Sequence, residues 1–396
     1  MTSSPRIGLW FAGTSAVFFA RAFLFSSWVS RGPEVQEALN INTAQMGLLS
    51  MVFPAGGLAG VLFASRLVQH FGARQVNTAT FVLAAAGFAL LGPAVETGNF
   101  ALSSLCLFAM GLPMAISDYL GNFEGSAVDK ASKRSLFPAI HGSFGAGMLL
   151  GASSASWFIS QGVSLTTSFL SVAIFVGSLA VVGGFGFPVH IANRKAVESS
   201  NEKPAKSINA WLEKRSLILA VIGFSFIMAE VSAGTWVPIA LANNGFSGAA
   251  AASAFGVFWI VITIARLVGG YLVELLGRYR TVLFSALTTG SGMLVFMTSE
   301  ATGLAYLGLI LWGLGMALGF PMVVSSMGDD SALAATRVNM IITVVYISSI
   351  SVGPALGALG QAAGIYVAFG IPLAMMVISA FLSPATKLKE SQGEFA

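Results

Sequence analysis

Gly270-Tyr-Leu-Val-Glu-Leu-Leu-Gly277-Arg278-Tyr-Arg280 has a counterpart earlier in the chain, Ser65-Arg-Leu-Val-Gln-His-Phe-Gly72-Ala-Arg74. When Gly72 is aligned with Gly277, a Leu-Val pair coincides in the two stretches, and an arginine follows each glycine within two residues. Each stretch lies between two long apolar runs. The chain therefore contains an internal repeat, which is typical of membrane proteins built from two related halves.

The composition points the same way. Of the 396 residues 56% are hydrophobic and only 9% are charged, and the mean hydropathy is +0.82. A soluble protein of this size needs more polar surface. A helix of about 20 residues crosses the ~30 Å hydrocarbon core of a bilayer, so the apolar runs predict membrane-spanning helices that leave no room for a soluble catalytic domain. The predicted spans are 8–30, 43–65, 76–94, 100–126, 136–160, 165–187, 216–242, 248–270, 280–298, 302–325, 334–357 and 361–383.

The spans fall into two sets of six, separated by the only long polar segment. We predict an N-terminal half at 1–189, a cytoplasmic linker at 190–215 with an amphipathic turn around Ile208–Leu212, and a C-terminal half at 216–396. Lys and Arg in short loops determine orientation. With the N-terminus inside, the opposite face carries only Arg31. Both termini and the linker are therefore predicted to be cytoplasmic, in a multi-pass protein of the inner membrane.

Ionisable groups within the predicted spans are the candidate functional residues, because each costs at least ~2.5–3.5 kcal/mol to insert. They are Arg21, Asp118, His141, Glu230 and Arg266. Asp118 and Asn122 have the i, i+4 spacing that places both on one helix face. A carboxylate in a low-dielectric cavity can exchange a proton near neutral pH, and an amide beside it can orient the acid or bind a hydroxyl group.

The other candidates leave alternatives open. Arg21 can pair with Asp118 or Glu230, statically or in one conformation only, or it can bind an anionic substrate. Arg266 is expected to extend toward the cytoplasmic loop or to pair with Glu274. Trp236, six residues after Glu230, is a candidate to stack on a sugar face or an aromatic ring.

Two further acids, Asp329 and Asp330, are expected to cap residues 331–333 or to pair with Arg337. A single pair of acids without a nearby histidine does not predict a metal site.

The repeated loop resembles the G-x-L-x-D-x-x-G-R-x signature of the major facilitator superfamily. This resemblance implies an all-α fold of twelve transmembrane helices in two pseudosymmetric halves. It also implies that the loop residues form a latch that breaks on opening. These residues are Gly72, Arg74, Glu274, Gly277 and Arg278.

Within that superfamily, three stretches resemble the fucose permease-like branch of sugar/proton symporters: Asp118 with Asn122, His141-Gly-Ser-Phe-Gly145, and Ala229-Glu230-Val231. By this resemblance Asp118 is the proton-coupling acid and Asn122 a sugar contact. Where that branch places an acid in helix 1, this chain has Arg21 and Trp28. We take Asp118, Glu230 and Arg21 as the candidate proton-coupling residues, and Asn122, Trp236, Trp28 and His141 as candidate substrate contacts.

The sequence thus predicts a proton-coupled secondary transporter of a small polar organic solute, a sugar or sugar-like compound. The alternatives are proton-antiport efflux of amphipathic compounds and a transporter-shaped receptor that binds solute without moving it. The chain has no phosphate-binding loop, metal-ligand spacing or nucleophile triad. We therefore expect no enzymatic activity, no metal, no cofactor other than the proton gradient and no nucleic-acid partner. The expected partners are the solute, protons and the lipid bilayer, and the expected functional unit is a monomer.

Overall fold

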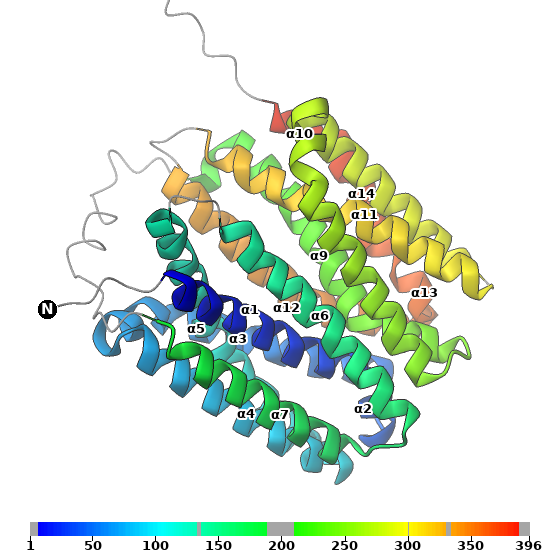
Figure 1. Ribbon diagram of the computed structural model, residues 1–396. Coiled ribbons are helices and arrows are strands. Elements are labelled where there is room, and N and C mark those ends of the chain that lie inside the picture. The colour runs from blue at the N-terminus through cyan, green and yellow to red at the C-terminus, as the bar shows by residue number, and fades with distance from the viewer. Residues whose placement is uncertain (1–6, 133–135, 188–209, 300, 330–333, 388–396) are drawn as a thin grey trace, which may run out of the picture. The chain divides into compact units, whose positions relative to one another are not determined.

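The computed structural model describes residues 7–132, 136–187, 210–299, 301–329 and 334–387, and all regular structure in these ranges is helical (Figure 1). Eleven of the twelve predicted spans each overlap one helix, and the last, 361–383, is divided among the end of one long helix and two shorter ones. The helices of the first half are α1 (Ile7–Ser30), α2 (Gly32–Ala38), α3 (Thr43–Phe71), α4 (Ala73–Glu96), α5 (Phe100–Ser132), α6 (Phe137–Ser160) and α7 (Leu165–Gly184). Those of the second half are η2 (Ala210–Leu212), α9 (Lys214–Asn243), α10 (Gly248–Thr298), α11 (Thr302–Met327), α12 (Ala334–Ala363), α13 (Ile365–Ala368), α14 (Gly370–Leu382) and η3 (Ser383–Thr386).

Ten segments among the described residues are long and apolar enough to cross a membrane. One of them, α10, has 51 residues and accounts for two predicted spans, because its backbone leaves the helical conformation at Gly277. With α6, whose 24 residues have the necessary length, the helices match the twelve predicted spans. The prediction of an all-helical membrane fold is confirmed.

The repeated loop has the same backbone conformation in both halves. Gly72 connects α3 to α4 with φ 81° and ψ 158°, and Gly277 bends α10 with φ 72° and ψ 161°. This region of φ and ψ is essentially restricted to glycine. The alignment of Gly72 with Gly277 therefore superposes two positions with the same conformational requirement.

Local sequence explains where several helices begin and end. Asn42 and Gln45 form a reciprocal capping box at the start of α3, and the Ser164 side chain caps α7. The short helix α2 was not predicted. It begins beside Pro33, whose fixed φ suits the first turn of a helix. The predicted amphipathic turn lies partly outside the described residues, and η2 covers its end.

By their contacts, the residues form two compact units: 1–202 with 233–260 and 353–365, and 203–232 with 261–352 and 366–396. These units do not test the predicted boundaries at 189 and 215, which stay predictions. In the first unit α1 packs against α5, α6 and α7, while α4 packs against α5 and α7 and α3 packs against α5.

Small residues allow the backbones to approach closely in both units. In the first unit, a Cβ atom at Gly60 of α3 would collide with the backbone of Leu112 in α5. Gly47 of α3 meets Gly353 of α12 in the same way. In the second unit, Gly292 of α10 lies against the backbone of Trp312 in α11, and these two helices run beside α14 (Figure 1).

Candidate functional site

The centre of the candidate site is an ion pair between α1 and α5. Arg21 Nη1 donates to Asp118 Oδ1, which is one of the two partners predicted for this arginine. The Arg21 side chain is 14% exposed, whereas that of Asp118 is 50% exposed. The pair is therefore anchored on its cationic side and accessible on its acidic side.

Asn122 completes the immediate environment of the acid. Its amide nitrogen donates to Asp118 Oδ1 over 3.1 Å and to the Asp118 backbone oxygen over 2.8 Å, as the i, i+4 spacing predicts. Both interactions with the carboxyl group use Oδ1. No described residue donates a hydrogen bond to Oδ2, so this oxygen is available to a proton or to a hydroxyl group of a solute.

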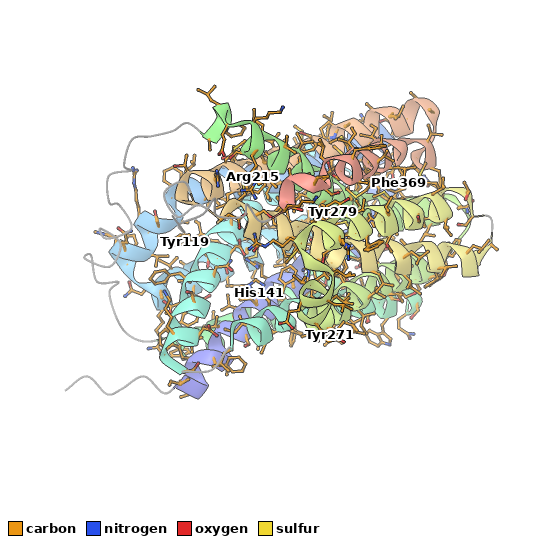
Figure 2. The ribbon with its side chains drawn as sticks, turned by 90° about the horizontal axis from the view of Figure 1, so that it is seen from above. Tyr119, His141, Arg215, Tyr271, Tyr279 and Phe369 are labelled. Carbon is orange, nitrogen blue, oxygen red and sulfur yellow. The ribbon has the colours of Figure 1, made fainter. Side chains whose placement is uncertain are left out.

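Aromatic rings surround the arginine. The guanidinium carbon of Arg21 lies 5.0 Å from the ring centroid of Phe18 and 5.2 Å from that of Phe144. The imidazole of His141 meets Phe18 edge to face at 4.9 Å, and Phe144 lies 5.9 Å from Trp259. His141, labelled in Figure 2, is exposed at the start of α6. Arg21, Asp118, Asn122 and His141, which the sequence singled out separately, thus belong to one cluster.

The two tryptophans predicted as substrate contacts are buried. Trp28 is 5% exposed and lies 6.4 Å from the ring of Phe169. Trp236 is fully buried, and its indole N–H has no hydrogen-bond partner among the described residues. Neither ring is accessible to a solute in this conformation, and their predicted role in binding stays a prediction.

The second unit contains its own acid–arginine pair. Arg266 of α10 lies 3.5 Å from the carboxylate of Glu230 in α9, and it also donates to the Ala317 carbonyl over 3.3 Å. The side chains of Arg266 and Glu230 are 39% and 22% exposed. Among the described residues, Arg266 therefore pairs with Glu230 and not with Glu274, so that alternative is wrong; the expected extension toward the loop stays a prediction. Glu274 itself is exposed.

The two copies of the repeated loop differ in what their arginines contact. In the first copy, the guanidinium carbon of Arg74 lies 4.2 Å from the ring centroid of Phe185, and Arg74 donates to the carbonyl of the same residue over 3.5 Å. In the second copy, Arg278 forms an ion pair with Asp329. Among the residues that the structure describes, an ion pair holds the arginine of the second loop and none holds that of the first.

Asp329 links three segments of the second unit. Besides Arg278, its carboxylate accepts from Arg215 at the start of α9 over 2.7 Å, and Arg215 also donates to the Lys387 carbonyl. Burial acts to raise the pKa of Asp329, but the hydrogen bonds and charges of Arg278 and Arg215 outweigh it and hold that pKa below its ordinary value. Figure 2 labels Arg215 at this cluster, together with Tyr279, whose ring lies 4.9 Å from the Lys387 amine.

Asp329 does not pair with Arg337, contrary to one expectation from the sequence. Arg337 is almost fully buried and donates to both carboxylate oxygens of Glu213, over 2.9 and 2.6 Å. Asp330 and residues 331–333 lie outside the described residues, so the capping alternative is untested.

Sequence reasoning missed two buried charged groups. Glu124, within a predicted span, is 5% exposed and accepts a hydrogen bond from the indole of Trp10. Arg31, assigned only a topological role, is 2% exposed and pairs with Glu34 while donating to the carbonyls of Val163 and Ser164. Glu124 satisfies the criterion applied to Asp118, an acid inside an apolar run, and could have been found by it. The contacts of Arg31 depend on a loop 132 residues away, which no local pattern shows.

Helices of membrane-spanning length, a glycine loop repeated in two halves and charged pairs between helices define a polytopic transport protein. The family model described as Major Facilitator Superfamily matches residues 10–354. The chain belongs to this superfamily and is a multi-pass membrane transporter, not an enzyme.

Comparisons with individual proteins agree. An uncharacterized MFS-type transporter of Yersinia pestis is 25% identical over 378 residues, which cover 94% of this chain and 95% of the relative. A glucose/galactose transporter of Brucella abortus is 24% identical over 400 residues, covering 96% and 94%. A solved structure of the Escherichia coli fucose:proton symporter FucP is 16% identical, covers 98% of this chain and 100% of its own, and superposes with a TM-score of 0.65. These similarities bear out the resemblance to the superfamily, and the likeness to FucP shows that the two proteins share this fold.

Proposed function

We propose that the protein is a proton-coupled symporter of a small polar organic solute, a sugar or sugar-like compound, in the inner membrane with both termini in the cytoplasm. The carboxylate of Asp118 carries the proposal, because Arg21 and Asn122 both bind its Oδ1 while the side chain as a whole stays 50% exposed. The similarity to a glucose/galactose transporter supports a sugar as the solute.

In this mechanism Asp118 exchanges its ionic partner for a proton. As a carboxylate it is stabilised by Arg21, and the pair keeps its charges neutralised within the membrane. When a proton binds, the attraction to Arg21 is lost and the guanidinium is released toward the rings of Phe18 and Phe144, which already lie beside it. Asn122 holds the carboxyl group in place in both states and offers an amide to a solute hydroxyl.

The protonation state thereby determines which contacts hold α1 to α5. Solute and proton then bind to neighbouring groups, the proton to Asp118 and the solute to Asn122. Rocking of the two halves exposes these groups to one side of the membrane at a time. The Glu230–Arg266 pair provides a second acid whose partner is a guanidinium. No cofactor other than the proton gradient is required.

The test uses the purified full-length protein in liposomes. A thermal-shift screen of sugars, nucleosides, carboxylates and lipophilic cations first selects the solute. Asp118→Asn keeps the shape of the side chain but cannot exchange a proton. It is expected to abolish uptake driven by a pH gradient while preserving exchange of labelled solute across the membrane.

Glu96→Gln is the matched control, because this acid lies at the end of α4, where it accepts hydrogen bonds from exposed groups of Thr166. It should leave driven uptake unchanged. With an inward gradient of one pH unit, each coupled proton contributes about tenfold to the limiting accumulation of solute. Full accumulation by Asp118→Asn would remove Asp118 from the mechanism.

A further inference from the structure

A second acid lies buried between the same two helices. Glu124 of α5 is 5% exposed, and its Oε2 accepts a hydrogen bond of 2.7 Å from the indole Nε1 of Trp10 in α1. Trp10 is 8% exposed. Both residues belong to segments long and apolar enough to span a membrane, and the packing of the protein around the carboxyl group shields it from water.

Among the described residues, none with a positive charge pairs with Glu124. The ionisable residues nearest to it along its own helix are Tyr119, Asp129, Asp118 and Lys130. The helices packed against α5 carry Arg21 on α1, Arg66 and His70 on α3, Arg74 and Glu96 on α4, and His141 on α6. None of these forms an ion pair with Glu124, and Trp10 is its only hydrogen-bond partner among the described residues. Lys130 is six residues further along the helix, about 9 Å at 1.5 Å per residue.

A carboxylate in this environment is costly. Burial of an unpaired charge is unfavourable, and one neutral donor compensates only part of the lost hydration. The carboxylic acid avoids the cost. The indole can donate but cannot accept, so its contact with Oε2 leaves Oε1 to hold the proton. Because a donor to Oε2 also stabilises a carboxylate, the burial of Glu124 favours the neutral acid and the Trp10 contact does not.

The two acids occupy successive contacts along the α1–α5 interface. From one end to the other, these contacts are Arg21 with Asp118, Phe18 with Gly121, and Trp10 with Glu124. At the middle contact the ring of Phe18 lies so close that a Cβ atom on Gly121 would be 2.8 Å from it. The interface between the two acids is tightly packed, so displacement of α1 from α5 would alter the surroundings of both.

We propose that Glu124 is a second proton-binding site of this transporter, loaded when α1 packs on α5 and emptied when α1 moves away. On loading, Oε1 takes one proton from water and the carboxylate becomes a neutral acid. On emptying, water reaches the carboxyl group and accepts the same proton. The link to transport rests on the proposed function, in which protons drive the solute, whereas the protonation of buried Glu124 rests on the local geometry alone.

Infrared difference spectroscopy of the full-length protein in lipid nanodiscs tests the protonation directly. Spectra are compared between about pH 5 and about pH 9, because an ordinary carboxyl group is ionised over most of this range. The wild type should show the carbonyl band of a buried carboxylic acid that disappears in Glu124→Gln. The band should persist in Asp118→Asn and move to higher frequency in Trp10→Phe, which removes the donor to Oε2. Glu37→Gln, in exposed α2, is the matched control. If Glu124→Gln removes no such band at any pH, the proposal is wrong.

Proton and solute fluxes in liposomes test the role in transport. Gln at position 124 can still accept from Trp10, so the variant is expected to fold. It should lower the measured ratio of protons to solute by one, and the limiting accumulation about tenfold per unit of pH gradient. An unchanged ratio would make Glu124 a structural acid and overturn the proposal. If the wild type shows the band but moves solute independently of the gradient, the proposed symport fails while proton binding at Glu124 stands.

Discussion

The glycine at the bend of α10 provides the most direct test of how the repeated loop is built. Gly277 has φ 72° and ψ 161°, and a Cβ atom there would meet no atom within 4 Å. Replacement by alanine therefore creates no collision with the surroundings, and its whole cost is conformational. Forcing a residue with a side chain into this region costs about 1–3 kcal/mol.

Gly270 is the matched control for Gly277→Ala. It also faces open space, but it lies within the regular helix of α10. Alanine there should stabilise the protein by about 0.5–1 kcal/mol, because it reduces the freedom of the unfolded chain and favours helix. The two alanine variants should thus change stability in opposite directions, although they differ from wild type by the same methyl group.

The assay is unfolding of both variants, purified in the same detergent, followed by tryptophan fluorescence under denaturant or heating. Gly277→Asn adds a further comparison. Asparagine tolerates the left-handed helical region, at φ of about +57° and ψ of about +47°. It does not tolerate a positive φ combined with a ψ near 160°. It should therefore fail to restore stability. If Gly277→Ala unfolds no earlier than wild type while Gly270→Ala behaves as expected, the conformational argument is refuted.

Two predictions concern the ion pairs of the second unit. Asp329→Asn should destabilise the protein by removing the partner of Arg215 and Arg278. Because folding lowers the pKa of Asp329, the stability that this acid contributes is present above the ordinary carboxyl pKa and is lost as the pH falls through the folded value. The stability of the variant should therefore fall less steeply with decreasing pH than that of wild type in acid unfolding. Equal acid sensitivity of the two proteins would contradict this. Glu213→Gln should leave the guanidinium of Arg337 without its carboxylate partner. The Arg337 side chain is 3% exposed, so the loss should lower the free energy of unfolding by about 3–5 kcal/mol, toward the lower end because Glu213 is 23% exposed. A denaturation midpoint equal to that of wild type would show that the pair contributes nothing to stability.

The membrane-spanning helices could be predicted because hydrophobic length is a local property of the sequence. The bend at Gly277 could also be located, since its counterpart Gly72 occurs in a recognisable repeat. The proximity of Asn122 to Asp118 followed from helical spacing alone. Each of these features depends on residues that are close in sequence or on a pattern that occurs twice.

The choice of ionic partners could not be predicted in the same way. Arg266 binds Glu230 and not the nearer-in-sequence Glu274. Such contacts depend on how far each helix is rotated about its axis and where it crosses its neighbour, and a rotation of one residue moves a side chain by about 100°. The aromatic contacts of Arg21 with Phe18 and Phe144 have the same origin, because phenylalanines are too frequent in this sequence to mark a position.

The shared conformation of Gly72 and Gly277 separates two kinds of requirement in the repeated loop. Around the glycines the two copies differ, with Gln69 opposite Glu274 and arginines that contact an aromatic ring in one half and a carboxylate in the other. Such side chains can be exchanged as long as some partner is found. A backbone torsion open only to glycine permits no such exchange, so a redesign of either loop can vary its charges but must keep its glycine.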